Sequence, residues 1–184
     1  MRNIIILVLI ISLLLVIFIN GCSPSSETNN ETSTATSSVN TIIGTRVGNL
    51  APDFQLQDIE GETVTLSGLR GNPVILNFWA TWCGWCVVEM PYLQEIFSDW
   101  QDEGLVMLAI NKGETYSEAQ EFMESNNLSF TALLDTDEAV SLMYGVSGIP
   151  ITIFIDKDGI IQGNRLGAFL SKDDIESYIV KIIP

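Results

Sequence analysis

The centre of this chain reads Asn77-Phe78-Trp79-Ala80-Thr81-Trp82-Cys83-Gly84-Trp85-Cys86. The apolar run from Val74 to Trp79 follows Gly71-Asn72-Pro73 and predicts a buried central strand. Apolar residues then recur at steps of three and four, which predicts a helix over 83–100 with a kink at Pro91. The expected buried stripe consists of Cys86, Met90, Leu93, Phe97 and Trp100. The two cysteines therefore stand where a strand turns into a helix.

A cysteine pair at a helix start is suited to thiol–disulfide exchange, because the thiolate is the nucleophile in that reaction. Unpaired N–H groups and the positive end of the helix dipole stabilise an anion in the first turn. We therefore expect Cys83 to be the attacking thiol. Cys86 lies one turn further on the buried side, and we expect it to resolve the mixed disulfide and release the product.

Other roles for the cysteine pair are weaker. A zinc site needs about four ligands, and the chain has no histidine and no second cysteine pair, which disfavours both zinc binding and copper delivery. A purely structural disulfide across two residues would stabilise little. In peroxiredoxins the peroxidatic cysteine follows the pattern Pro-x-x-x-Thr/Ser-x-x-Cys. Before Cys83 these two places are held by Leu76 and Ala80, which disfavours peroxidase activity. A thiol peroxidase and a non-catalytic binding module remain as alternatives, and no metal or cofactor is expected.

The remaining segments alternate between strand and helix signals. Ser171, with Asp174 three residues on, approximates a capping box at the start of the last helix. The expected elements are a hairpin over 54–57 and 63–66, a strand over 105–110, a helix over 117–125, a strand over 130–134, a helix over 138–144, a hairpin over 151–155 and 160–166, and a helix from 171. This order predicts an α/β fold, with a mixed central β-sheet flanked by helices and an N-terminal β-hairpin.

The N-terminal segment predicts export and attachment to a membrane. Arg2 precedes an apolar run over 4–19, and Ile19-Asn20-Gly21-Cys22 resembles the lipobox of bacterial lipoproteins. We expect residues 1–21 to be a lipoprotein signal peptide and Cys22 to be lipidated. Residues 22–44 would then form a flexible linker rich in Ser, Thr and Asn, and residues 45–184 the folded domain. An uncleaved signal anchor is the alternative, and it gives the same location at the extracytoplasmic face of the bacterial cell membrane.

The charge balance excludes one class of partner. The chain has 184 residues, an apolar fraction of 47% and a net charge of −15, which becomes −16 once residues 1–21 and their single arginine are removed. Nucleic-acid binding requires clustered basic residues that neutralise phosphates, so no nucleic-acid partner is expected. Anionic lipid headgroups would repel the domain, which suits attachment through a tether.

Several motifs together resemble the TlpA/ResA branch of the thioredoxin superfamily, which is similar to the CcmG/DsbE proteins of cytochrome c maturation. The matching segments are residues 77–86, Glu89-Met90-Pro91, Ala51-Pro52-Asp53-Phe54, Gly148-Ile149-Pro150 and Ile153-Phe154-Ile155-Asp156. The resemblance implies a thioredoxin-like fold and a protein-disulfide reductase that acts on exported protein disulfides. It further implies electrons from a membrane thiol donor and an apocytochrome c as a natural client.

The resemblance also assigns roles to single residues. Pro150 matches a cis-proline beside the thiols that presents the backbone of Ile149 to the substrate. Glu89 matches an acid that tunes the thiols, and its place three residues beyond Cys86 agrees, although an exposed helix acid remains the alternative. Asn77 stands where cytosolic thioredoxins have a titratable aspartate, so proton transfer must fall to Glu89, water or the substrate.

The aromatic residues around the cysteines complete the expected site. Trp85 stands where the family usually has proline. Its N–H, which proline would lack, is expected to face the Cys83 sulfur, to favour the thiolate and to raise the reduction potential. Trp79 and Trp82 are expected to be structural aromatics around the site, and substrate binding is the alternative.

Overall fold

The computed structural model of the chain describes residues 41–183. The expected signal peptide, Cys22 and residues 22–40 of the expected linker lie outside this range. No helix within 41–183 has the length and apolar character to cross a membrane.

Every strand and helix expected inside the domain is present, with ends that shift by at most two residues. The short 3-10 helices η2 and η3 were not expected. In chain order the elements are β1 (Gln55–Asp58), β2 (Thr63–Thr65), η2 (Leu66–Leu69), β3 (Val74–Trp79), α2 (Gly84–Trp100), η3 (Gln101–Glu103), β4 (Val106–Lys112), α3 (Tyr116–Ser125), β5 (Thr131–Asp135), α4 (Ala139–Met143), β6 (Ile151–Ile155), β7 (Ile161–Leu166) and α5 (Lys172–Ile182).

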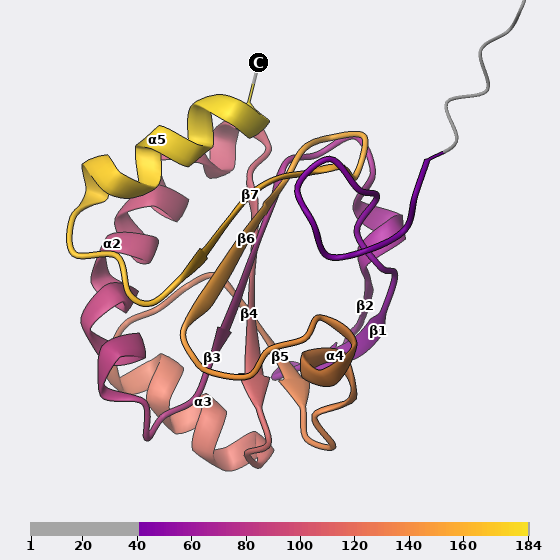
Figure 1. Cartoon of the computed structure of the whole chain (residues 1–184). Helices are drawn as coiled ribbons and strands as arrows, with labels where there is room; N and C mark the ends of the chain where they lie inside the picture. The colour runs from indigo at the N-terminus through magenta and orange to yellow at the C-terminus, as the bar shows by residue number, and fades with distance from the viewer. Residues whose placement is uncertain (1–40, 184) are drawn as a thin grey trace, which may run out of the picture. The chain divides into compact units, whose positions relative to one another are not determined.

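The seven strands form one mixed sheet in the order β2-β1-β5-β4-β3-β6-β7. β3 and β5 run parallel to β4 on its two sides, whereas β6, β7, β1 and β2 join by antiparallel pairing. Figure 1 shows β3 and β4 at the middle of the sheet, with α2 and α5 beside them. The mixed sheet and the N-terminal hairpin of β1 and β2 confirm the predicted fold class.

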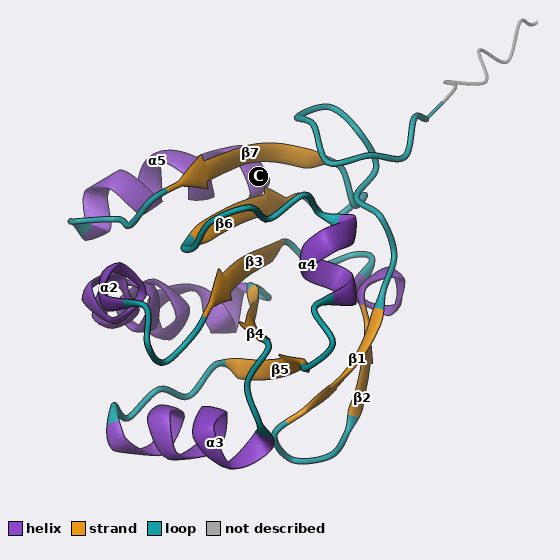
Figure 2. Cartoon of the chain, turned by 60° about the horizontal axis from the view of Figure 1, so that its bottom comes forward, coloured by secondary structure: helices purple, strands orange, loops and turns teal. Residues whose placement is uncertain are grey.

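Helices cover both faces of the sheet. Figure 2 shows α5, α2 and α3 on one face and α4 on the other. Each residue of β3 is buried, and alternate side chains enter different cores: Ile75 and Trp79 pack with α2, whereas Leu76 and Phe78 pack toward α4. A strand buried on both sides needs a nearly continuous apolar run, and residues 74–79 provide it with Asn77 as the one polar residue.

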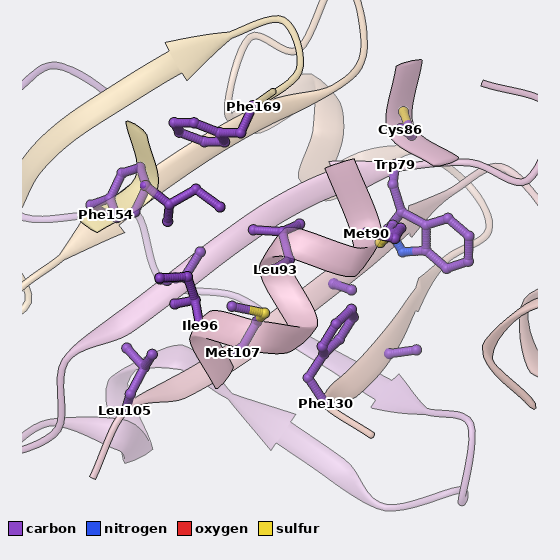
Figure 3. Packing of buried hydrophobic residues seen from close by; sticks show 14 of the residues in the cluster. Trp79, Cys86, Met90, Leu93, Ile96, Leu105, Met107, Phe130, Phe154 and Phe169 are labelled. Carbon is purple, nitrogen blue, oxygen red and sulfur yellow. The ribbon is translucent and has the colours of Figure 1, made fainter. Parts of the chain in front are cut away.

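Helix α2 runs from Gly84 to Trp100 through Pro91, whose side chain is exposed. In Figure 3 the side chains of Met90, Leu93 and Ile96 point from this helix into the core beside Trp79, Met107 and Phe130. The expected stripe was partly wrong, because Phe97 and Trp100 are only half-buried, while Ile96 and Glu89 are fully buried. The buried stripe of α2 is therefore wider than the apolar pattern, and it includes an acid.

The segment before β1 is hydrogen-bonded to the turn between β6 and β7. Leu50 N–H donates to the Ile42 carbonyl at 2.9 Å, and Ala51 N–H donates to the Gly159 carbonyl at 3.0 Å. Ile42 therefore already takes part in backbone hydrogen bonding, slightly ahead of the domain boundary expected at residue 45.

Candidate active site

Cys83 occupies the N-cap position of α2, and Cys86 lies within the first turn of the helix. The two sulfurs form a disulfide whose Cα atoms are 5.2 Å apart. Cys83 retains 7% exposure, whereas Cys86 is fully buried. The strand-to-helix placement matches the prediction, and it gives an outer and an inner sulfur.

The outer sulfur receives a backbone hydrogen bond from the helix. Cys86 N–H donates to Cys83 Sγ at 3.1 Å. After reduction, the same donor and the helix dipole would stabilise a Cys83 thiolate. The donor is thus the N–H of Cys86 rather than that of Trp85, which differs from the expectation for Trp85. A residue at the third helical position is the usual donor to an N-cap side chain.

A cleft of about 380 Å³ opens beside Cys83, and Trp82, Trp85 and Ile149 belong to its lining. The Ile149–Pro150 peptide bond is cis, as the resemblance implied. An apolar groove of about 320 Å³ adjoins the cleft, lined among others by Trp85, Pro150 and Leu166. The fold therefore brings residues 148–150, which are distant in sequence, to the cysteine pair.

Two tryptophans stand exposed beside the disulfide. Trp82 is 70% exposed and Trp85 is 63% exposed, whereas Trp79 is fully buried in the core. Trp79 is therefore a structural aromatic, as expected, whereas Trp82 is not a core residue and the choice between its two expected roles stays a prediction. Trp82 is the third residue after β3, in the loop that leads into α2, and it lines the cleft beside Cys83.

Glu89 is fully buried in α2, so the alternative of an exposed helix acid is wrong. Asn77 Nδ2 of β3 donates to Glu89 Oε1 at 2.7 Å, and the backbone N–H of Phe169 donates to Glu89 Oε2 at 3.0 Å. Asn77 Nδ2 also donates to Thr152 Oγ1 of β6 at 3.0 Å. Residues three apart on a helix have Cβ atoms about 5–6 Å apart, so Glu89 and Cys86 are neighbours on the buried side of α2.

Burial raises the pKa of Glu89 from 4.5 to about 7, because an ionised carboxylate loses its hydration in the core. The hydrogen bonds from Phe169 N–H and Asn77 and the charge of Arg165 oppose this rise without cancelling it. A carboxyl group with this pKa can both take up and release a proton near neutral pH.

Glu114 is a residue of the site that the sequence did not indicate. Its carboxylate accepts hydrogen bonds from Thr81 N–H at 2.9 Å, from the Thr81 hydroxyl and from Asn111 Nδ2 at 2.6 Å. It therefore holds the segment that leads from β3 to Cys83. A usable signal was present, because Glu114 follows β4, and β3 and β4 are parallel neighbours whose carboxyl ends meet.

No three Cys, Asp or Glu side chains within 41–183 gather in a way that could hold a metal ion. Within these residues the site consists of a disulfide, a buried acid, a cleft and the apolar groove that adjoins it.

Comparison with known proteins identifies the family of the chain. The model of the AhpC/TSA family matches residues 47–163. The thiol-disulfide oxidoreductase ResA of Geobacillus thermodenitrificans is 40% identical over 138 residues, which cover 75% of this chain and 79% of that protein.

Two solved structures have the same fold. A thiol:disulfide interchange protein of the thioredoxin family from Chlorobium tepidum is 25% identical, with a TM-score of 0.67 over 76% of this chain and 98% of that chain. A secreted disulfide oxidoreductase of Mycobacterium tuberculosis, described as homologous to E. coli DsbE, is 26% identical, with a TM-score of 0.62 over 69% of this chain and 94% of that chain. The cysteine pair, the sheet and these relatives agree: the chain belongs to the AhpC/TSA family, as a ResA/DsbE-like thiol-disulfide oxidoreductase with a thioredoxin-like fold.

Proposed function

We propose that this oxidoreductase works as a reductant of disulfides in exported proteins, at the extracytoplasmic face of the membrane, where Cys22 attaches it. The proposed client is the Cys-x-x-Cys-His segment of an apocytochrome c, and the proposed electron source is a membrane thiol donor. The observation that carries the direction of the reaction is Glu89, buried one turn beyond the inner cysteine.

The charge of Glu89 bears on the redox direction. A dithiol is a strong oxidant when its reduced form is stabilised, as a thiolate is by nearby positive charge. An ionised Glu89 acts in the opposite sense, because a negative charge close to Cys86 disfavours a second negative charge there. The disulfide is then favoured over the dithiol, and the reduced protein gives its electrons away readily.

The proposed reaction begins when the Cys83 thiolate attacks one sulfur of the substrate disulfide. A mixed disulfide forms, and the other substrate sulfur leaves as a thiolate and takes a proton from water. Glu89 then accepts the proton of Cys86, directly or through a water molecule. The Cys86 thiolate attacks Cys83 Sγ, the mixed disulfide breaks, and the second substrate sulfur leaves and is protonated in turn. Two electrons have passed to the substrate, and the protein ends with the Cys83–Cys86 disulfide.

The substrate segment is proposed to lie in the cleft between Trp82, Trp85 and Ile149. Its neighbour, the groove beside Pro150, is mostly apolar and offers space for a side chain next to the substrate cysteine. A protein segment with apolar residues near its disulfide fits this surface better than a small polar disulfide does.

Trapping tests the clients. Cys86→Ala should accumulate mixed disulfides between Cys83 and its clients, because the resolving thiol is missing, and mass spectrometry of the adducts should find exported proteins with Cys-x-x-Cys-His segments. The control is the Cys83→Ala/Cys86→Ala double variant, which should trap nothing. Adducts that contain no exported protein would contradict the proposed clients.

The reduction potential of the Cys83–Cys86 pair tests the direction of the reaction. A potential more positive than about −180 mV, the value for protein disulfide isomerase, would contradict the proposed direction.

Labelling with a fatty-acid analogue tests the tether. Cells that produce the wild type should show a labelled protein. Cys22→Ala should lose the label, because Cys22 is the one residue of the expected lipobox that would accept the lipid. The matched control is Ser25→Ala, which changes a residue just after the lipobox and should keep the label. Equal labelling of wild type and Cys22→Ala would show that the lipoprotein assignment is wrong and favour a signal anchor.

A further inference from the structure

A single peptide group separates the buried acid from a positively charged side chain. The N–H of Phe169 donates to Glu89 Oε2 at 3.0 Å. The carbonyl of the same peptide group, that of Ala168, accepts from Arg165 Nη2 at 3.3 Å. The order is therefore guanidinium, Ala168–Phe169 peptide, carboxylate, with one hydrogen bond on each side of the peptide.

The peptide group is held in this position by packing. Phe169 is fully buried, and the Arg165 guanidinium carbon lies 4.9 Å from the centre of its ring. The same ring meets Phe154 edge-on at 6.0 Å in the core under α5, where Figure 3 shows the two side by side. The peptide group is planar and the residues on both sides of it are fixed by packing. The two hydrogen bonds therefore keep a fixed geometry relative to each other.

Such an arrangement affects the charge of the acid. A cation that draws on a peptide carbonyl polarises the group and makes its N–H a better donor. A better donor favours the ionised form of the carboxyl group that accepts from it. The positive charge of Arg165 also lowers the pKa of Glu89 through space, against the effect of burial.

The other groups that face Glu89 carry no charge. Asn77 comes from β3, Thr152 stands behind it on β6, and Cys86 precedes Glu89 on α2. Within residues 41–183, Arg165 is the charged side chain whose field acts on the Glu89 carboxyl group. The charge state of Glu89 therefore depends on β7, an element that contributes nothing to the cysteine pair itself.

We propose that Arg165 is a positioning residue that keeps Glu89 partly ionised near neutral pH, acting through the Ala168–Phe169 peptide. Glu89 could otherwise be a permanently protonated core residue with no part in proton transfer. The use of this ionised fraction to take the proton of Cys86 rests on the proposed function, whereas the control of Glu89 by Arg165 does not.

The test measures the titration of Glu89 directly. The side-chain carboxyl carbon of Glu89 is followed by NMR against pH in the oxidised full-length protein, where the cysteines do not titrate. Arg165→Gln removes the charge and Arg165→Met removes the charge and the hydrogen bond, and both should raise the midpoint by roughly half a pH unit or more. Arg165→Lys keeps the charge and should stay close to the wild type. Arg46→Gln removes an exposed arginine on the segment before β1 and is the matched control, with an unchanged midpoint.

A second readout is the amide proton of Phe169. Its resonance should follow the same midpoint in the wild type and move upfield in Arg165→Gln, because its hydrogen bond to Glu89 weakens. If Arg165→Gln does not fold, Arg165→Met supplies the measurement, since its aliphatic chain can still cover the Phe169 ring. An unchanged Glu89 midpoint in a folded Arg165→Gln or Arg165→Met overturns the proposal, as does an equal shift in Arg46→Gln.

The pH profile of disulfide exchange separates this proposal from the proposed function. If the Glu89 midpoint and the rate profile rise together in Arg165→Gln, both stand. A midpoint that rises while the profile stays in place supports the role of Arg165 and overturns proton transfer by Glu89.

Discussion

Cys83→Ser is expected to slow the reduction of a protein disulfide such as insulin by at least about a thousandfold, as loss of a catalytic nucleophile generally does. Serine cannot form a disulfide with the substrate, and Cys86 is fully buried and cannot take over the attack. The measurement is the initial rate of insulin reduction by the reduced protein, in which the reduced variant is compared with the wild type at equal concentration.

Cys86→Ser is the matched control for this prediction. It keeps the outer thiol and should still form mixed disulfides, although without completing turnover. In the reduced wild type, iodoacetamide should modify Cys83 well before Cys86, because the outer sulfur borders the cleft. Faster modification of Cys86, or an active Cys83→Ser protein, would reverse the assignment of the two thiols.

The free energy of unfolding of the wild type is expected to fall as the pH rises, and Glu89→Gln is expected to remove most of this fall. The pKa of Glu89 is raised from 4.5 to about 7 in the folded protein. The folded state therefore holds a proton that the unfolded chain has already released. This contribution to stability is fully present below pH 4.5 and is lost as the pH rises through about 7. A difference of about 2.5 pH units corresponds to about 3 kcal/mol.

Urea unfolding of the oxidised protein between pH 4.5 and pH 8.5 measures this effect. From the low to the high end of the range, the free energy of unfolding of the wild type should fall by about 3 kcal/mol relative to that of Glu89→Gln. Glu95→Gln changes an exposed acid of the same helix and is the control, which should behave like the wild type. Parallel pH curves for the wild type and Glu89→Gln would show that Glu89 does not titrate in this range.

The fold was predictable because its strongest signals are local. Residues 74–79 are apolar except for Asn77 because β3 is buried on both faces. The steps of three and four in α2 identified Cys86, Met90 and Leu93 as buried, but the one-face pattern left out Ile96. Whether a residue at the edge of such a stripe is covered depends on neighbouring elements, which the spacing of a single helix does not reveal.

The site was predictable only in part, for the same reason. Cys83 and Cys86 lie close in sequence, and their chemistry is evident from their position between a strand and a helix. Glu89 was indicated by the resemblance, with which its spacing from Cys86 agrees, but its hydrogen bond from Phe169 spans 80 residues. Glu114 reaches Thr81 across 33 residues. Contacts of this kind arise from strand order, so no local pattern of residues announces them.

Trp82 and Trp85 give the protein an optical property. Of its four tryptophans, Trp79 is buried and Trp100 is half-buried, while Trp82 and Trp85 line the cleft and are 70% and 63% exposed. Indole emission moves to shorter wavelength when water leaves the ring. A polypeptide that covers the cleft would remove water from both exposed rings together, so the intrinsic fluorescence of the unlabelled protein would report substrate docking.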